Sequence, residues 1–228
     1  PTPAPFIASA TFSDSGSSIN VYFDSATNKA ANTSAFPCSD IFEFVGSERS
    51  TCLWTSSNAV TIAFQDTEMY VYCSPKEKLS LKQRSGIKAS CPPGSDCSDW
   101  QYSVAQSVVI SPPDNPVVPI VVFNVPSKVS SCDSIDVDVS LSSGSGGRNY
   151  TFFSWAVFIS KGNLLQEANL IRDNLTASGH SLYTTRKIQD LVVDATYHIS
   201  LTLKNFLGQS SSATAVSYTH LTLPTNRE

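Results

Sequence analysis

The sequence predicts an all-β protein made of two tandem immunoglobulin-like β-sandwich domains. Short segments such as Ser18–Phe23 and Ala59–Phe64 alternate between apolar and polar residues, which is typical of half-buried strands. Four prolines in the stretch 111–119 interrupt this pattern, and no central strand or helix tolerates them. With 228 residues, the chain is long enough for two domains of ~100–150 residues.

These observations place a cysteine-bearing β-sandwich at 1–112, a proline-rich linker at 113–119 and a second β-sandwich at 120–216. Asp14-Ser-Gly16 favours a tight hairpin turn, because glycine accepts positive φ without steric cost. The strands predicted for the first domain are Ala8–Phe12, Ser18–Phe23, Ala59–Phe64, Met69–Cys73 and Ser103–Ile110. Those predicted for the second are Ile120–Phe123, Ser134–Leu141, Thr151–Ile159, Lys187–Val193 and Thr196–Leu203.

One segment has helical instead of strand spacing. Apolar residues three and four positions apart, namely Leu164, Ala168, Ile171 and Leu175, can cover one face of a short helix that crosses between sheets. Trp155 lies in the alternating segment 151–159 and is predicted to fill the core of the second sandwich. The glycines at 144, 146 and 147 predict a tight connection between strands. They do not predict a phosphate cradle, because such a cradle needs a helix after the glycines and a strand follows here.

The six cysteines indicate disulfides and not a metal site, because none forms a Cys-x-x-Cys pair. Prolines and a glycine between Cys91 and Cys97 bias that loop to turn back, so we expect a local bridge. A bridge between Cys38 and Cys52 is expected across the segment 41–47. Cys73 and Cys132 remain, and they either form a third bridge across the linker or stay as thiols.

Composition excludes several partners. The net charge of −4 and the absence of a Lys/Arg cluster argue against nucleic acid. No apolar run is long enough to span a bilayer, so a membrane is reached only through parts of the parent protein outside this chain. Because the chain begins with Pro1, we expect it to be a fragment. Sequons predict glycosylation in an oxidising compartment, at Asn32, Asn149 and Asn174.

Residues of the second half resemble a known family. Segments 131–140, 144–148, 153–157 and 197–208 resemble the PKD repeat, and more closely the PKD-like part of the receptor-for-egg-jelly (REJ) region of polycystin-1-type proteins. The similarity covers about residues 117–216. Many PKD repeats have an Asp-Phe-Gly-Asp-Gly-type turn after the tryptophan, whereas here Ala156 and the residues after it extend the strand, which favours the REJ variant.

The first half is similar to the cysteine-bearing β-region that precedes such domains in REJ-like proteins, through the segments 12–19, 52–56 and 87–91. The C-terminal segment 217–228 resembles a translated sequencing adapter, and we expect it to be a non-native tail. The alternative is a genuine last strand with a polar end.

No catalytic constellation stands out, and no enzyme activity or cofactor is expected. Three histidines have no recognisable catalytic partner, namely His180, His198 and His220. The self-cleavage tripeptide of polycystins appears at 220–222, but the upstream pattern of that family is absent. Carboxylates that resemble calcium ligands fit solvated charges better than a metal site, namely Asp133, Asp136, Asp138, Asp96 and Asp99.

The predicted function is that of an extracellular adhesion, ligand-recognition or mechanical spacer module of a large polycystin-like membrane protein. It would act on the outer side of the cell surface, or as a secreted protein, with a protein or glycan ligand. The alternative is a carbohydrate-binding or accessory module of a secreted enzyme, with a sugar-stacking face formed by Trp54, Trp100 and Tyr102. Burial of the tryptophans would reject that alternative. A purely structural spacer without a ligand is a third possibility.

Overall fold

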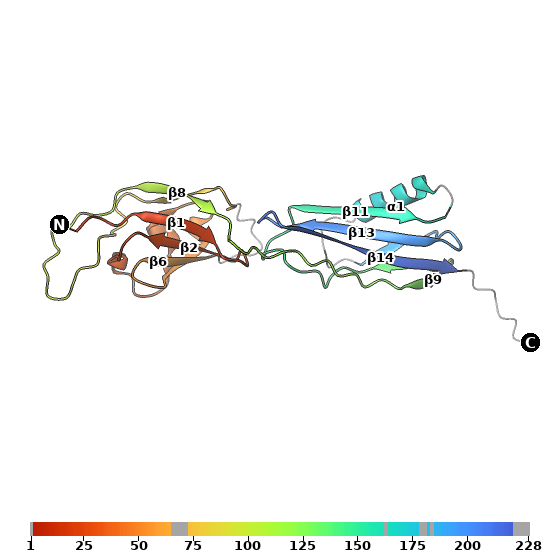
Figure 1. Cartoon of the computed structure of the whole chain (residues 1–228), viewed down its shortest axis with the longest axis horizontal. Coiled ribbons are helices and arrows are strands. Elements are labelled where there is room, and N and C mark those ends of the chain that lie inside the picture. Colours follow the sequence, from red (N-terminus) through yellow and green to blue (C-terminus); the bar gives the residue numbers. More distant parts are fainter. Residues whose placement is uncertain (1, 65–72, 162–163, 178–181, 183–184, 221–228) are drawn as a thin grey trace, which may run out of the picture. The chain divides into compact units, whose positions relative to one another are not determined.

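The structure is a computed structural model that describes residues 2–64, 73–161, 164–177, 182 and 185–220 (Figure 1). The chain divides into two compact units. Unit 1 consists of residues 1–117 with 146–148, and unit 2 of residues 118–145 and 149–228. The division between Val117 and Val118 falls inside the proline-rich segment 113–119.

The short segment 146–148 corrects the predicted domain bounds, because it packs in unit 1 although the sequence placed it in the second sandwich. The guanidinium of Arg148 lies 5.6 Å from the ring centre of Phe12 and 5.2 Å from that of Phe64. It also donates a hydrogen bond to the carbonyl of Cys73. A cation over aromatic faces is a favourable contact that domain prediction from strand patterns does not detect.

Unit 1 is an eight-stranded sheet in the order β3-β5-β6-β2-β1-β8-β7-β4. The first and last strands, β1 and β8, pair in parallel, and the other pairs of described strands are antiparallel. The strands are β1 Ile7–Phe12, β2 Ser18–Phe23, β3 Phe36–Pro37, β4 Phe42–Glu43, β5 Ser50–Trp54, β6 Ala59–Phe64, β7 Lys78–Leu81 and β8 Gln106–Ser111. Short 3-10 turns cover Lys29–Ala31, Cys38–Asp40 and Ser47–Arg49.

The hairpin predicted around Gly16 is confirmed. Ile19 of β2 pairs with Phe12 of β1, and Gly16 has a φ of 76°. Alternate residues of β2 are buried, as the period-2 pattern requires, whereas β1 buries Ile7, Ala10 and Phe12 because its register shifts between Ile7 and Ser9. The fully buried side chains of unit 1 include Phe12, Ile19, Phe42, Ile62, Leu79 and Ile110.

Unit 2 contains two sheets, one of four strands in the order β11-β13-β14-β9 and one of two strands, β10-β12. Its first and last strands, β9 and β14, are again the parallel pair, and the other pairs are antiparallel. The elements are β9 Lys128–Ser130, β10 Ile135–Val137, β11 Phe152–Ile159, α1 Leu165–Ala177, β12 Arg186–Ile188, β13 Thr196–Lys204 and β14 Ser210–His220 (Figure 1).

Trp155 is 3% exposed and lies in the core of unit 2, which confirms its predicted structural role. Phe123 and Phe153 meet its ring edge-on, with ring centres 6.1 and 5.9 Å away. The buried guanidinium of Arg186 lies 5.3 Å from the same ring and donates to the carbonyl of Leu175. The aromatic faces and this carbonyl offset part of the cost of burying the charge.

The predicted helix is present as α1, which follows β11 and packs against it (Figure 1). Ala168 and Leu175 are buried, and Leu164 and Ile171 pack against the same core. Ala168, Ile171 and Leu175 therefore lie on the core side of the helix, and Leu164, directly before it, contacts the same core.

The connection between β10 and β11 depends on Gly144. Its φ is +86°, and a Cβ at this position would stand 2.4 Å from the carbonyl oxygen of Val118 and 2.7 Å from the Cα of Pro119. Glycine is thus required both by the backbone conformation and by the close approach of another segment of unit 2.

The predicted fold class, all-β with two tandem immunoglobulin-like sandwiches, is confirmed by this arrangement. Several strand bounds differ, however. The predicted strand 120–123 forms only a bridge between Ile120 and Ser143, and residues 103–105 precede β8. The predicted strand 69–73 lies outside the described residues except for Cys73.

The segment 217–228 begins inside β14, so its first four residues belong to the sheet. Ser217 and Thr219 are fully buried, and the Thr219 hydroxyl accepts a hydrogen bond from the amide of Ala195 over 3.0 Å. This pairing corrects the exclusion of 217–220 from the fold. Residues 217–220 are paired in the sheet, as the alternative of a genuine last strand requires. Residues 221–228 lie outside the described residues, and for them the non-native origin stays a prediction.

Candidate functional site

The connection between β7 and β8, residues 82–105, is a long loop with an ordered path, and we call it the stapled loop. In Figure 1 it is the yellow-green segment near the N-terminus. The amide of Asn28 donates to the carbonyl of Lys88 over 2.9 Å, and the amide of Ser90 donates to that of Ala26 over 2.9 Å. Ile87 is fully buried below them. Loops of this length without regular structure are commonly functional.

A disulfide gives this loop its name. Cys91 and Cys97 are bonded, which confirms the predicted local bridge. The intervening Gly94 has a φ of 80°, so the chain turns back there as expected. The closed loop is exposed, because residues 91–96 all face solvent. The cross-link therefore orders a surface segment, whose backbone would otherwise sample many conformations.

Large apolar side chains are exposed where the stapled loop meets the N-terminal segment. The Ser103 hydroxyl, itself buried, donates to the carbonyl of the buried Pro5 over 2.6 Å. The neighbours of these two anchors point the other way: Phe6 is 52%, Tyr102 58% and Val104 75% exposed. We call these three side chains the apolar edge. Exposed apolar groups of this kind, when grouped, mark interaction surfaces.

The electrostatics of the loop are acidic beyond Lys88. Between residues 89 and 105 the only charged side chains are Asp96 and Asp99. The amide of Ser98 donates to Asp96 over 3.0 Å and lowers the pKa of that carboxyl, so it stays ionised. The ammonium of Lys88 lies 4.3 Å from the ring centre of Tyr102 and donates to the carbonyl of Ser98.

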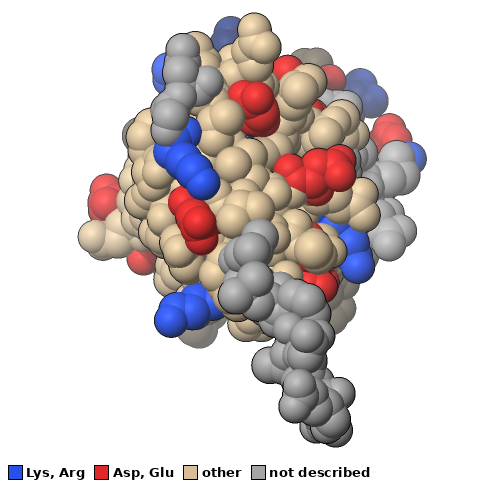
Figure 2. All heavy atoms as spheres, turned by 90° about the vertical axis from the view of Figure 1, so that its right-hand side faces the viewer, with Lys and Arg blue, Asp and Glu red and all other residues tan. Residues whose placement is uncertain are grey.

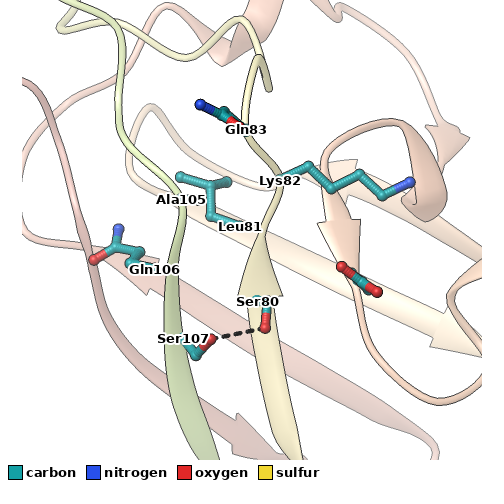
Figure 3. A pocket seen from close by; sticks show the side chains of 8 residues that line it. Ser80, Leu81, Lys82, Gln83, Ala105, Gln106 and Ser107 are labelled. Atoms are coloured by element: carbon teal, nitrogen blue, oxygen red, sulfur yellow. Dashed lines mark hydrogen bonds between the residues drawn. The ribbon is translucent and has the colours of Figure 1, made fainter.

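A polar groove of about 530 Å³ lies at the base of the stapled loop (Figure 3). Gln83 and Ala105, at the two ends of the loop, line it together with Gln106 of β8. The hydroxyls of Ser80 and Ser107 are hydrogen-bonded at 2.8 Å across its floor. The groove offers amide and hydroxyl groups without an aromatic face.

The predicted sugar-stacking face is not assembled. Trp54 is 9% exposed and stacks on Phe23 with ring centres 5.6 Å apart, so it belongs to the core of unit 1. Trp100 is half-buried, and only Tyr102 is well exposed. A sugar-stacking platform needs exposed aromatic faces on one surface, and the buried Trp54 cannot contribute one. The sugar-stacking face that includes Trp54 is therefore rejected.

The carboxylates considered for calcium act as surface charges. Asp136 accepts a hydrogen bond from the Ser134 hydroxyl and lies 3.9 Å from the ammonium of Lys187. The amide of Ser140 lowers the pKa of the Asp138 carboxyl. Asp133, Asp96 and Asp99 are exposed. Within the described ranges, no three metal-ligating side chains gather.

The histidines show no triad-like geometry among the residues described. His198 faces outward from β13 and contacts the ring of Phe158 at a tilt of 45°, with ring centres 5.6 Å apart. His220 ends β14, and its Nδ1 is buried. His180 and the last two residues of the tripeptide at 220–222 lie outside the described residues.

The remaining cysteines correct one prediction and confirm another. Cys38 and Cys52 form the expected disulfide, with Cα atoms 5.0 Å apart. Cys73 and Cys132 are free thiols, so the third bridge is not formed. Cys73 is fully buried in unit 1, and Cys132 is exposed after β9 in unit 2. Burial raises the pKa of the Cys73 thiol to about 11.

The three sequons lie in different environments. Asn149 is exposed in the connection before β11, and Asn174 is exposed on α1. Asn32 is half-buried beside the first 3-10 turn, where its side-chain amide donates to the carbonyls of Lys29 and Ala30. Glycosylation at these three positions stays a prediction.

Two surface features bear on partners. Acidic and basic side chains are interspersed with uncharged ones on the face in Figure 2, so that face shows no basic patch for a polyanion. Among the described residues, no helix has the length and apolar character needed to cross a membrane.

Comparisons with known proteins do not identify a family. No family model and no curated protein match the chain. Among solved structures, the N-terminal Ig1-2 module of the Drosophila receptor protein tyrosine phosphatase DLAR is 8% identical, with 97% of this chain and 100% of that chain covered and a TM-score of 0.26. The chicken CNTN1 FN1-FN3 domains are 13% identical, with 96% and 67% covered and a TM-score of 0.31.

Extracellular cadherin domains 1-5 of protocadherin gamma B2 are 12% identical, with 99% of this chain and 41% of that chain covered and a TM-score of 0.26. Similarity at this level is too low to identify a family or a function. The architecture described above rests on the chain's own strand pairing.

Proposed function

We propose that the chain is an extracellular, non-catalytic module of a large polycystin-like membrane protein, in which it bears tension and holds recognition loops in place. The observation that carries the load-bearing role is shared by both units. In each of them the first strand pairs in parallel with the last strand, β1 with β8 and β9 with β14.

This pairing determines how tension acts on each unit. Because paired parallel strands run in the same direction, the chain enters at one end of the pair and leaves at the other. Tension on the two ends then slides the strands past each other, and all hydrogen bonds of the pair carry the load together. An antiparallel pair pulled at one end would instead lose its bonds one after another.

Unit 2 shows the hydrogen bonds that would resist such sliding. Tyr218, Thr219 and His220 of β14 are in register with Lys128, Val129 and Ser130 of β9. The amide of Tyr218 donates to the carbonyl of Ser127 over 2.9 Å, and the amide of Ser131 donates to that of His220 over 3.1 Å. The hydrogen bonds between β9 and β14 therefore continue one residue beyond each end of β9.

Three features support an extracellular role within a polycystin-like parent. Both disulfides of unit 1 are typical of oxidising compartments, where such bonds persist. The sequons at Asn149 and Asn174 are on the surface. The motifs in residues 117–216 resemble the REJ region, and rigid β-sandwiches are suited to hold exposed loops in place.

Single-molecule pulling on the whole chain tests the load-bearing role. Ser131→Pro removes a donor from the parallel pair and should lower the highest unfolding force of unit 2. Asn124→Pro is the matched control, because it removes one donor from the antiparallel bridge to Asp138 in the same unit. We expect the control to leave the highest force unchanged. A larger loss of unfolding force for Asn124→Pro than for Ser131→Pro would reject the proposal that the parallel pair of β9 and β14 carries the load.

The parent protein is tested separately. The coding sequence of the parent should encode several long apolar helices in addition to this chain. A parent in which this chain adjoins a glycoside hydrolase domain would reject the polycystin-like assignment in favour of the secreted-enzyme alternative.

A further inference from the structure

We propose that the apolar edge (Phe6, Tyr102 and Val104), together with Asp96 and Asp99 of the stapled loop, is a docking surface for a polypeptide partner. The complementary partner surface would have an apolar centre bordered by Lys or Arg side chains. This inference rests on the proposed extracellular role only because the Cys91–Cys97 bridge needs an oxidising compartment.

The geometry groups the apolar edge on one side of two neighbouring segments. Ser103 and Pro5 are joined by a buried hydrogen bond, and both turn their side chains inward. Residues alternate in direction along an extended chain, so Phe6, Tyr102 and Val104 face solvent beside this anchor. Val104 is the most exposed of the large apolar side chains in the described residues. Apolar side chains exposed to water do not stabilise the folded chain, whereas a bound partner would bury them and gain free energy.

The surface is ordered before any partner binds. The amide of Ser103 donates to the carbonyl of Ile87 over 2.8 Å, Thr27 and Ala89 form a backbone bridge, and the disulfide closes the segment 91–97. Binding to such a loop loses little conformational entropy, which favours affinity. Tyrosine in a rigid surface is also a frequent energetic centre of protein interfaces.

Charge decides which partner fits. The carboxylates of Asp96 and Asp99 outnumber the one ammonium beside them, that of Lys88, which already contacts the Ser98 carbonyl and the Tyr102 ring. The surface therefore favours cationic groups over anionic lipid surfaces. A saccharide fits less well, because Lys88 already covers one face of the Tyr102 ring and Val104 has no ring on which a sugar can stack. A basic, partly apolar polypeptide satisfies both the charges and the exposed apolar area.

The test selects ligands from a random-peptide display library on the intact chain. We expect enriched peptides in which apolar residues adjoin Lys or Arg, and affinity that falls as salt rises. Tyr102→Ala should weaken these peptides about tenfold or more. Phe158→Ala is the matched control, because Phe158 is an aromatic of unit 2 with 62% exposure, and it should leave binding unchanged.

A second variant separates the loop's order from its chemistry. Cys91→Ser with Cys97→Ser keeps every proposed contact residue but opens the staple, and it should weaken the same peptides while circular dichroism stays β-type. Enrichment that is equal for wild type and Tyr102→Ala would overturn the proposal. So would Tyr102-dependent binding on a glycan array without peptide enrichment. Neither outcome affects the pulling experiment, so the two proposals fail independently.

Discussion

Unit 1 and unit 2 share parallel pairing of their terminal strands but stabilise the rest of their structure by different means. Unit 1 adds both disulfides, three 3-10 turns and the stapled loop to a buried apolar core of its own. Unit 2 has a continuous apolar cluster around Trp155, covered by α1, and its cysteine Cys132 is unpaired. The difference teaches that regular alternation orders a sandwich through burial, whereas irregular segments need covalent links or buried anchors.

The largest expected effect is in the core of unit 2. Trp155→Ala should reduce the free energy of unfolding by about 3–5 kcal/mol, because it removes a buried aromatic and leaves a cavity. Trp100→Ala is the comparison, because Trp100 is half-buried in the stapled loop, and it should reduce the free energy of unfolding by less. Denaturant unfolding of the whole chain measures both. A loss under about 1 kcal/mol for Trp155→Ala, well below the usual core value, would reject its role as core.

The next largest effect is expected at the buried disulfide of unit 1, Cys38–Cys52. Opening the Cys38–Cys52 bridge with serine at both positions should cost about 3 kcal/mol, since the closed loop restricts the unfolded chain. The two residues are separated by 14 positions, and both are fully buried. Calorimetry should show a lower transition for the variant. If the transition stays in place, burial alone sustains unit 1, and the contrast with unit 2 disappears.

Gly144→Ala tests the close approach in unit 2. We expect a loss of about 1–3 kcal/mol from the positive φ, with a further contribution from the contact with Val118. Gly147→Ala is the control, because its φ is also positive but its Cβ would meet nothing within 4 Å. Equal losses for the two variants would show that the backbone conformation, and not the contact, makes glycine necessary.

The smallest effect concerns pH and unit 1. Burial raises the pKa of the Cys73 thiol from 9.0 to about 11, so between these values the unfolded chain binds fewer protons than the folded chain. The free energy of unfolding should then fall as pH rises. The contribution is complete below pH 9 and is lost as the pH passes about 11. Cys73→Ala should flatten this slope in pH-dependent denaturation, and an unchanged slope would place the titration elsewhere.

The sequence predicted the elements in which large apolar residues alternate. Strands β2 and β6 have the predicted bounds, and α1 contains Ala168, Ile171 and Leu175, three of the four residues chosen from their spacing, while Leu164 directly precedes it. Strand β14 was missed, because its residues are mostly serine, threonine and alanine and show no apolar period. It is a strand because β13 and β9 supply hydrogen bonds on its two sides.

The candidate surface was harder to predict. The bridge Cys91–Cys97 followed from local turn residues, but the apolar edge depends on the contact between Ser103 and Pro5, which are far apart in the chain. Arg186 was also missed, since a buried guanidinium over Trp155 has no signal in a pattern of apolar residues. Contacts of this kind depend on tertiary packing, which strand patterns do not encode.

The direction of an applied force tests the central claim most directly. In the full chain, attachment points at Val118 and the C-terminus slide β9 along β14, whereas points at Val118 and Ser210 pull on the same end of both strands. We predict a clearly higher unfolding force for the first pair at the same loading rate. Equal forces in the two directions would contradict the load-bearing role of the parallel terminal strands.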